Sequence, residues 1–215
     1  MEEPETITLV AKGPNRWKLV TPDHKHATLD DAAVVDGGLV SGDPWTPAVR
    51  ERVTRVLAEA GARIAAARLL RVRPRSSAEL RERLRKRFPA EAADMAVDTL
   101  VRSGAVDDAR LARDLAEHMG ELRPHAREAI RDRLERAQVG AEALESALEA
   151  HAPSSGESRR AHEAAQAQLR RLRTLSLSPE ALRRRMFGAL ARRGFDAEVA
   201  AEAVERALGP TGEEA

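Results

Sequence analysis

The stretch that decides the fold is "ALARRGFDAEVA", residues 189–200, because it contains the end of one helix and the start of another. Ala, Leu and Arg favour a helix before the break, and Glu, Val and Ala favour one after it. Gly194 stands where a helix ends in the left-handed conformation, and Asp196 where an N-cap residue begins the next helix. Between them lies Phe195, one of only 3 Phe in the chain, so a scarce aromatic residue is placed at a helical corner.

The same corner occurs twice more along the chain. Phe88 and Val139 take the place of Phe195, and Ala-Glu begins two residues after each of the three. Two large apolar residues, four positions apart, precede each corner, and the second of them recurs at intervals of 50 and 56 residues. A period of this length is typical of an array of small helical units. The apolar pairs are Leu80/Leu84, Ile130/Leu134 and Met186/Leu190.

Each unit has a further helical segment upstream of its corner, in which apolar residues recur at helical spacing. Ser76, three residues before Glu79, indicates a helix start with a capping box, and Ser178 followed by Pro179 indicates another start. We therefore predict three tandem three-helix repeats, similar to helix-turn-helix units, in an elongated array. The corner residue is expected to fill the small core that alanine-rich helices leave open.

The first part of the chain has a different pattern. "TITLVAK", "NRWKLVT" and "HATL" are typical of short β-strands, and "GPN" and "PDHK" between them are typical of turns. We predict a mainly α fold preceded by a small β-rich segment that packs on the first repeat. The predicted domains are residues 1–48 (β-rich extension), 49–104, 105–152 and 153–209 (the three repeats) and 210–215 (tail).

Composition excludes several classes of protein. The chain has no Cys, so disulfides and thiolate metal sites are excluded, and His24 and His26 have no further ligands near them in the sequence. Asp107 and Asp108 are interpreted as the start of a helix. Phosphate-binding glycine loops and catalytic triads with supporting context are absent, so we expect neither an enzyme nor a cofactor. An apolar run of membrane-spanning length and a signal peptide are also absent, so we expect a cytoplasmic monomer without membrane contact.

Net charge is +1, but its sign alternates along the chain. Residues 68–87 and 159–193 carry +7 and +8, whereas residues 88–122 and 194–215 each carry −5, so second helices are basic and third helices acidic. One interpretation is that the opposite charges help the helices pack. The other is a basic stripe that attracts polyanions. The candidate contacts of this stripe with a filament or DNA are Arg81, Arg85, Lys86, Arg127, Arg131, Arg183, Arg184, Arg185, Arg192 and Arg193.

Four motifs, in order and at matching spacings, resemble the RecX family of regulators of RecA recombinase. "RPRSSAELRERL" is similar to its Arg-Pro-x-Ser and Glu-Leu signature, "SGAVDDARLA" to its Gly-x-x-Asp-Asp element, and "LARRGFDAEV" to its last Arg-Arg-Gly-Phe. "RWKLVTPDHKHATLDDAAVVDGGLVSGD" resembles the β extension of the longer members. Among the departures, Gln138 stands where the family commonly has Gly.

The resemblance implies three three-helix units, no cofactor and binding along the groove of a RecA–DNA filament. It implies that binding restrains filament growth and lowers ATP hydrolysis, strand exchange and co-protease action, with roles in homologous recombination, DNA repair and the SOS response. Weak, non-specific contact with single- or double-stranded DNA is expected as well. One alternative is a non-specific or transcriptional DNA-binding protein of tandem helix-turn-helix units, and another is an adaptor that binds only protein. The acidic third helices argue against insertion into a major groove.

Overall fold

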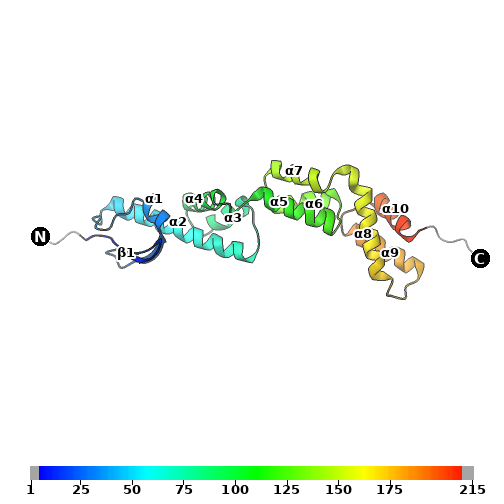
Figure 1. The fold of residues 1–215 in the computed structure, drawn as a ribbon, viewed down its shortest axis with the longest axis horizontal. Coiled ribbons are helices and arrows are strands. Elements are labelled where there is room, and N and C mark those ends of the chain that lie inside the picture. Colours follow the sequence, from blue (N-terminus) through cyan, green and yellow to red (C-terminus); the bar gives the residue numbers. More distant parts are fainter. Residues whose placement is uncertain (1–4, 210–215) are drawn as a thin grey trace, which may run out of the picture. The chain divides into compact units, whose positions relative to one another are not determined.

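The computed structural model describes residues 5–209 of the chain. These residues form two compact units that divide between Val106 and Asp107 (Figure 1). The first unit contains a small β-sheet and one three-helix repeat, and the second contains two three-helix repeats. Within residues 5–209, no helix combines the length and apolar character needed to cross a membrane.

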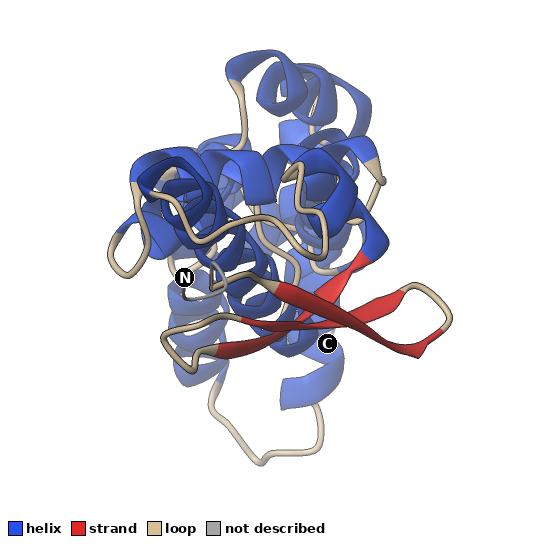
Figure 2. Ribbon diagram, turned by 90° about the vertical axis from the view of Figure 1, so that its left-hand side faces the viewer, coloured by secondary structure: helices blue, strands red, loops and turns tan. Residues whose placement is uncertain are grey.

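The first unit begins with a three-stranded antiparallel meander, shown as red arrows in Figure 2. Strands β1 (Thr8–Gly13) and β2 (Arg16–Val20) form a hairpin, and β3 (His26–Asp30) pairs with β2 on its other side. Gly13, at the turn, has a φ of 136°, which favours glycine. The predicted β-rich segment is confirmed.

One face of the sheet is covered by helices α1 (Asp31–Asp36) and α2 (Pro47–Val72). Asp30 and Thr46 cap the two helices, since their side chains accept hydrogen bonds from the first-turn amides. The first half of α2 supplies Val49, Val53 and Val56 to the shared core. The extension therefore packs on the first helix of the first repeat, as predicted.

The second half of α2 packs with α3 (Ser77–Arg85) and α4 (Ala90–Arg102) to form the first repeat. Ser76 caps α3, because its Oγ accepts a hydrogen bond from the Glu79 amide at 3.1 Å. At the corner after α3, Phe88 is only half-buried and lies against Gly61 of α2. A Cβ on Gly61 would lie 3.0 Å from a ring carbon of Phe88, so glycine permits this close approach.

The second repeat contains α5 (Asp108–Glu117), α6 (Arg127–Arg136) and α7 (Ala141–His151). Helix α5 continues into one π-helical turn, η1 (His118–Leu122). Val139 is buried at the corner, as predicted. Gln138, just before it, has a φ of 56°, so this residue adopts the left-handed conformation for which glycine is better suited.

The third repeat contains α8 (Glu157–Leu172), α9 (Pro179–Ala191) and α10 (Ala197–Leu208), after a short 3₁₀ turn, η2 (Ser154–Gly156). Its corner confirms the prediction at all three positions. Gly194 has a φ of 83°, Phe195 is 4% exposed, and the Asp196 carboxylate accepts a hydrogen bond from the Glu198 amide.

Repeats 2 and 3 contact each other at this corner. The Ala126 amide, at the start of α6, donates a hydrogen bond to the Arg193 carbonyl oxygen at 3.0 Å. A Cβ on Gly194 would lie 2.8 Å from the Ala129 Cβ, so the backbone of the corner rests directly on α6. Each repeat nevertheless has its own apolar core, and the predicted mainly α class with three three-helix repeats is confirmed.

We expect Gly194→Ala to lower the free energy of unfolding of the second unit by about 2–4 kcal/mol. A left-handed alanine and overpacking against Ala129 each contribute about 1–2 kcal/mol. The control is Gly104→Ala, because Gly104 has a φ of 72°, but within residues 5–209 no heavy atom beyond its two chain neighbours lies within 4 Å of the position that a Cβ would take there. It should lose only about 1 kcal/mol in urea denaturation. Equal losses for the two variants would show that contact with α6 does not matter.

Candidate charged interface

In the first repeat, two candidate arginines of α3 are paired with α4. Arg81 and Arg85 each follow a buried leucine by one residue, which turns them about 100° away from the core. The Arg81 Nη2 lies 2.6 Å from a carboxylate oxygen of Asp98, and the Arg85 Nη2 lies 2.7 Å from one of Asp94. The Asp94 carboxylate also raises the pKa of Arg85.

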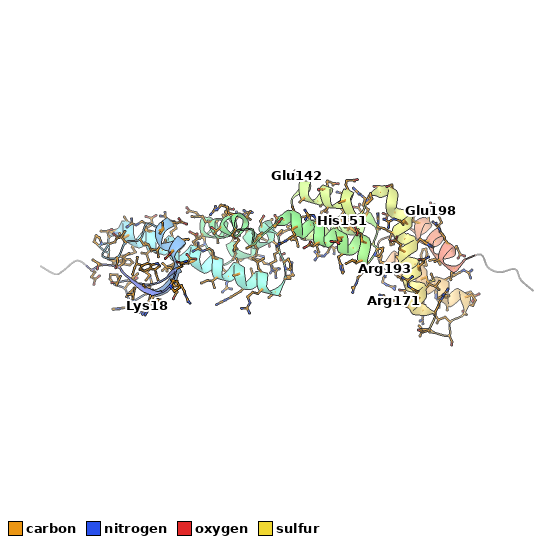
Figure 3. All side chains as sticks on the ribbon, viewed as in Figure 1. Lys18, Glu142, His151, Arg171, Arg193 and Glu198 are labelled. Carbon is orange, nitrogen blue, oxygen red and sulfur yellow. The ribbon has the colours of Figure 1, made fainter. Side chains whose placement is uncertain are left out.

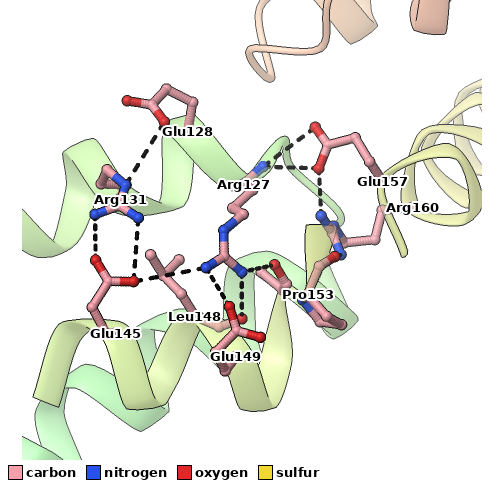
Figure 4. A network of polar contacts seen from close by, with 10 residues as sticks. Arg127, Glu128, Arg131, Glu145, Leu148, Glu149, Pro153, Glu157 and Arg160 are labelled. Carbon is pink, nitrogen blue, oxygen red and sulfur yellow. Dashed lines mark hydrogen bonds and ion pairs between the residues drawn. The ribbon is translucent and has the colours of Figure 1, made fainter. Parts of the chain in front are cut away.

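The second repeat repeats this arrangement between α6 and α7 (Figure 4). Arg131 follows buried Ile130 and binds both oxygens of Glu145, at 2.6 and 3.3 Å. Its hydrogen bond holds the pKa of Glu145 below the usual range. The Arg127 Nη2 lies 2.6 Å from Glu149, while its Nη1 donates to carbonyl oxygens at the end of α7, those of Leu148 (3.2 Å) and Ala152 (2.7 Å).

In the third repeat, Arg183 stands three residues before buried Met186, and its Nε donates to Glu205 of α10 at 2.9 Å. The accepting carboxylates of all three repeats lie six or ten residues after the corner residue. We call these pairs the interhelical clamps. For these arginines the structure supports the packing interpretation of the alternating charge. The clamp arginines are Arg81, Arg85, Arg127, Arg131 and Arg183.

The remaining candidates lie outside the clamps. Lys86 pairs with Glu82 within its own helix, at 2.9 Å. Arg184, Arg185 and Arg192 are exposed, and none has an ion pair within residues 5–209. Two differences in sequence explain why repeat 3 lacks the clamp that Arg81 and Arg131 form in the other repeats. The position six residues after its corner is Ala201 instead of an acid, and Phe187 instead of Arg follows its first buried apolar residue.

Arg193 is half-buried and follows the exposed Arg192 in the chain. Its Nη1 is buried without a hydrogen-bond partner in the described chain. Burial, followed by the positive charges of Arg171 and Arg192, lowers the pKa of Arg193. Figure 3 labels Arg171 and Arg193 in the second unit. Arg171 lies in α8, and sequence reasoning missed it because only the second helices were considered. A desolvated guanidinium among like charges is an arrangement that an anion would stabilise.

A second residue missed by sequence reasoning is Arg160 of α8, whose side chain is 0% exposed. Its Nη1 donates to the Pro153 carbonyl oxygen at 2.9 Å, and its Nη2 pairs with Glu157. The other face of this carboxylate accepts from the Arg127 amide, at 3.2 and 3.4 Å (Figure 4). Glu157 thus places a negative charge at the N-terminus of α6, where free amides and the helix dipole favour one.

Histidine and acidic side chains are the remaining candidates for metal binding. Among residues 5–209, no three His, Cys, Asp or Glu side chains are close enough to form such a site. His151 of α7 instead pairs with Glu121 of η1, with 2.7 Å between Nδ1 and Oε1. This histidine is thus used for an ion pair within the second repeat.

A model described as the first three-helix domain of RecX matches residues 62–100, and one described as the third matches residues 157–204. The regulatory protein RecX of Mycobacterium ulcerans (strain Agy99) is 34% identical over 147 residues, 68% of this chain and 84% of the relative. That of Thermobifida fusca (strain YX) is 33% identical over 157 residues, 72% of this chain and 83% of the relative. The chain belongs to the RecX family.

Two solved structures share its fold. A crystal structure of regulatory protein RecX has a TM-score of 0.62 at 17% identity and covers 94% of this chain and 98% of its own. The structure of RecX from Lactobacillus salivarius has a TM-score of 0.53 at 15% identity, with coverages of 70% and 97%. The RecX family consists of regulatory proteins, and the three family motifs within the repeats of this chain coincide with helix ends.

The RecX-like motif "RPRSSAEL" places the carboxylate of Glu79 among arginine side chains at the start of α3. Glu79, whose side chain is 10% exposed, accepts from the Nη2 of Arg73 (2.7 Å) and the Nε of Arg83 (2.9 Å), and also pairs with Arg75. This carboxylate gathers three guanidinium groups. Burial by itself raises the pKa of Glu79, but the hydrogen bond from Arg83 and the charges of Arg75 and Arg73 outweigh it, so the pKa is lowered.

Arg160→Met is expected to lower the free energy of unfolding by about 2–4 kcal/mol, because Glu157 and the Pro153 carbonyl lose a buried donor. The matched control is Arg159→Met on the same helix, since the Arg159 side chain is 63% exposed and pairs only along the helix with Glu163. The control should lose less than about 1 kcal/mol. Urea denaturation of both variants checks this, and similar losses would assign no special role to the buried guanidinium.

Glu79→Gln should destabilise the first unit in a pH-dependent way. The folded-state pKa of Glu79 lies below its usual value of 4.5, so its contribution is present above pH 4.5 and is lost as pH falls through the lower, folded-state value. The difference in stability between parent and variant should therefore be largest at pH 7 and shrink toward pH 3. Denaturation curves at several pH values measure it. A difference that stays constant would mean that the charge of Glu79 contributes nothing.

Proposed function

We propose that this protein binds the RecA–DNA filament and restrains the recombinase, lowering its ATP hydrolysis, strand exchange and co-protease action. Membership of the RecX family of regulatory proteins carries this proposal. A RecA filament is a polymer of subunits on DNA, so a protein with several small repeats is able to contact neighbouring subunits and the phosphates between them. Such contacts hinder subunit addition and ATP turnover without chemistry of the regulator's own.

The contact surface in this proposal is the repeat-3 arginine cluster, which we define as Arg171, Arg184, Arg185, Arg192 and Arg193. The clamp arginines are already neutralised by carboxylates of their own repeat, whereas the exposed members of this cluster have no ion pair within residues 5–209. Phosphate oxygens or partner carboxylates supply the missing counter-charge, and guanidinium groups bind both bidentately. The partly desolvated Arg193 strengthens such a contact, because its Nη1 has no hydrogen-bond partner within residues 5–209 to lose.

The alternative of a sequence-reading DNA-binding protein fits the charges less well. In a helix-turn-helix unit the recognition helix enters the major groove. The third helices here carry acids, among them Asp94, Glu145 and Glu205, that bind arginines of the second helices. Inserting such a helix would bring carboxylates close to phosphates. We therefore expect free DNA to be bound weakly, without sequence preference, and with an affinity that falls steeply with salt.

The test measures ATP hydrolysis by the host's own RecA on single-stranded DNA, as a function of added protein. The parent is expected to inhibit. Arg184→Glu, Arg185→Glu and Arg192→Glu combined should raise the half-inhibitory concentration at least about tenfold, since three exposed or partly desolvated ionic contacts become repulsive. Arg183 and Arg193 are left intact, because one belongs to a clamp and the other is half-buried.

The matched control combines Arg55→Glu, Arg110→Glu and Arg206→Glu. These arginines are also exposed and without ion pairs within residues 5–209, so both triple variants have the same net charge. The control should inhibit like the parent. If the cluster variant also inhibits like the parent, the repeat-3 arginine cluster is not the contact. If the parent itself leaves RecA unaffected while binding DNA, the DNA-binding alternative replaces the proposal.

A further inference from the structure

The first repeat has a hollow between the second half of α2 and the end of α3 that the proposed function does not use. Its volume is about 420 Å³, within the range of roughly 300–1,000 Å³ typical of ligand pockets. Ala65, Leu69 and Phe88, all partly buried at the edge of the repeat-1 core, form much of its floor. The floor is therefore apolar and continuous with the core, yet open to solvent.

Large apolar side chains are exposed on the α2 side of this hollow. Ile64, which lines it, is 52% exposed. Val72, eight residues further along α2 and on the same helical face, is 78% exposed. Eight residues of helix span about 12 Å. Apolar residues grouped in this way beside a hollow are typical of a binding surface for another apolar group.

The surroundings of the hollow are basic. Of the described residues that line it, none is acidic and four are basic: Arg68, Arg83, Lys86 and Arg87. Arg83 and Lys86 already pair with Glu79 and Glu82 on α3. Arg68 and Arg87 are exposed and have no ion pair within residues 5–209. The hollow between α5 and α7 differs, because Arg113 is accompanied there by Glu142. An apolar floor with unpaired cations above it is complementary to an apolar group flanked by carboxylates.

We propose that this hollow docks an acidic, amphipathic helix of a partner protein. One leucine-sized side chain of that helix enters between Ile64 and Phe88, and its flanking Asp or Glu residues pair with Arg68 and Arg87. This is the helix-in-groove mode of peptide recognition, in which apolar residues three and four apart supply the anchors. A nucleic acid fits less well, because phosphates leave the aliphatic floor wet and the hollow offers only one aromatic ring for base stacking.

The test of this site is independent of the proposed function, because peptide binding is measured with the full chain in the absence of recombinase and DNA. The probe is a fluorescein-labelled synthetic 18-residue peptide of Glu, Ala and Leu with its leucines three and four positions apart. A second peptide of identical composition, with its leucines distributed around the helix, tests the need for an apolar face. Labelled oligothymidylate of 20 nucleotides tests nucleic acid. Fluorescence anisotropy at low and physiological salt gives the affinities.

Four variants locate the binding site. Arg68→Glu is compared with Arg55→Glu, an equal charge change at an exposed residue of the same helix. Ile64→Ser is compared with Val101→Ser, because Val101 of α4 is 44% exposed and does not line the hollow. We expect Arg68→Glu and Ile64→Ser each to weaken binding of the amphipathic peptide at least tenfold, and the two controls to change it less than twofold. Unaltered circular dichroism and melting temperature confirm folding.

Three results would overturn the proposal. The first is that the amphipathic peptide does not bind, or binds no better than its rearranged counterpart. The second is that Arg68→Glu and Arg55→Glu weaken it equally, since binding would then follow net charge. The third is that oligothymidylate displaces the peptide and is itself weakened tenfold by Ile64→Ser, which would make the hollow a nucleic-acid groove.

Discussion

Close packing of alanine is the constraint on which the rest of the structure depends. Alanines at which the first and third helices meet are buried in every repeat, and several are 0% exposed: Ala66, Ala93, Ala112, Ala116, Ala161, Ala165 and Ala200. Alanine brings backbones together but buries little apolar area, and stability from burial scales with that area, at roughly 25 cal/mol per Å². Each core therefore depends on a few larger side chains, the apolar pair of the second helix and the corner residue. This dependence explains why the corner recurs while most of the surrounding sequence does not.

The same constraint determines what the charges do. With so thin a core, the second and third helices lie close enough for arginine to reach carboxylates across the groove between them. The clamp pairs are partly exposed, so solvent screens them and each stabilises the fold only slightly. Under the proposed function, the larger effect of the clamps is on which arginines remain available to bind a partner. A clamp neutralises two charges on the surface that a partner meets. Among the described residues, repeat 3 has the Arg183–Glu205 clamp, and its arginines at other helical positions have no ion pair.

Sequence reasoning predicted features that local residues determine, and missed those that distant ones determine. Strands, N-caps and the left-handed Gly194 depend on neighbours in the chain, and these predictions are confirmed. The clamps join residues up to 22 positions apart, so net charge by segment did not separate clamped from free arginines. Helical phase contains that information, because every clamp arginine stands one residue after or three before a member of the apolar pair of its second helix, and Arg184, Arg185 and Arg192 do not. Arg160 was missed for a related reason. It is four residues before buried Ala164, hence in phase with the core, but a charged residue was assumed to be exposed.

Buried Arg160 also connects the joint between repeats 2 and 3 with the free charges of repeat 3. Glu157, held by Arg160, binds the first amide of α6, and the next contact along this joint is the hydrogen bond from Ala126 to the Arg193 carbonyl. The backbone of Arg193 is thus fixed by packing, and α8, anchored at its start by the same network, places Arg171 near it. The joint therefore sets the backbone position of Arg193 against the repulsion from Arg171 and Arg192. In the proposed complex, an anion would relieve this repulsion. A cluster on fixed backbone would also lose less free energy to ordering on binding than a flexible basic tail.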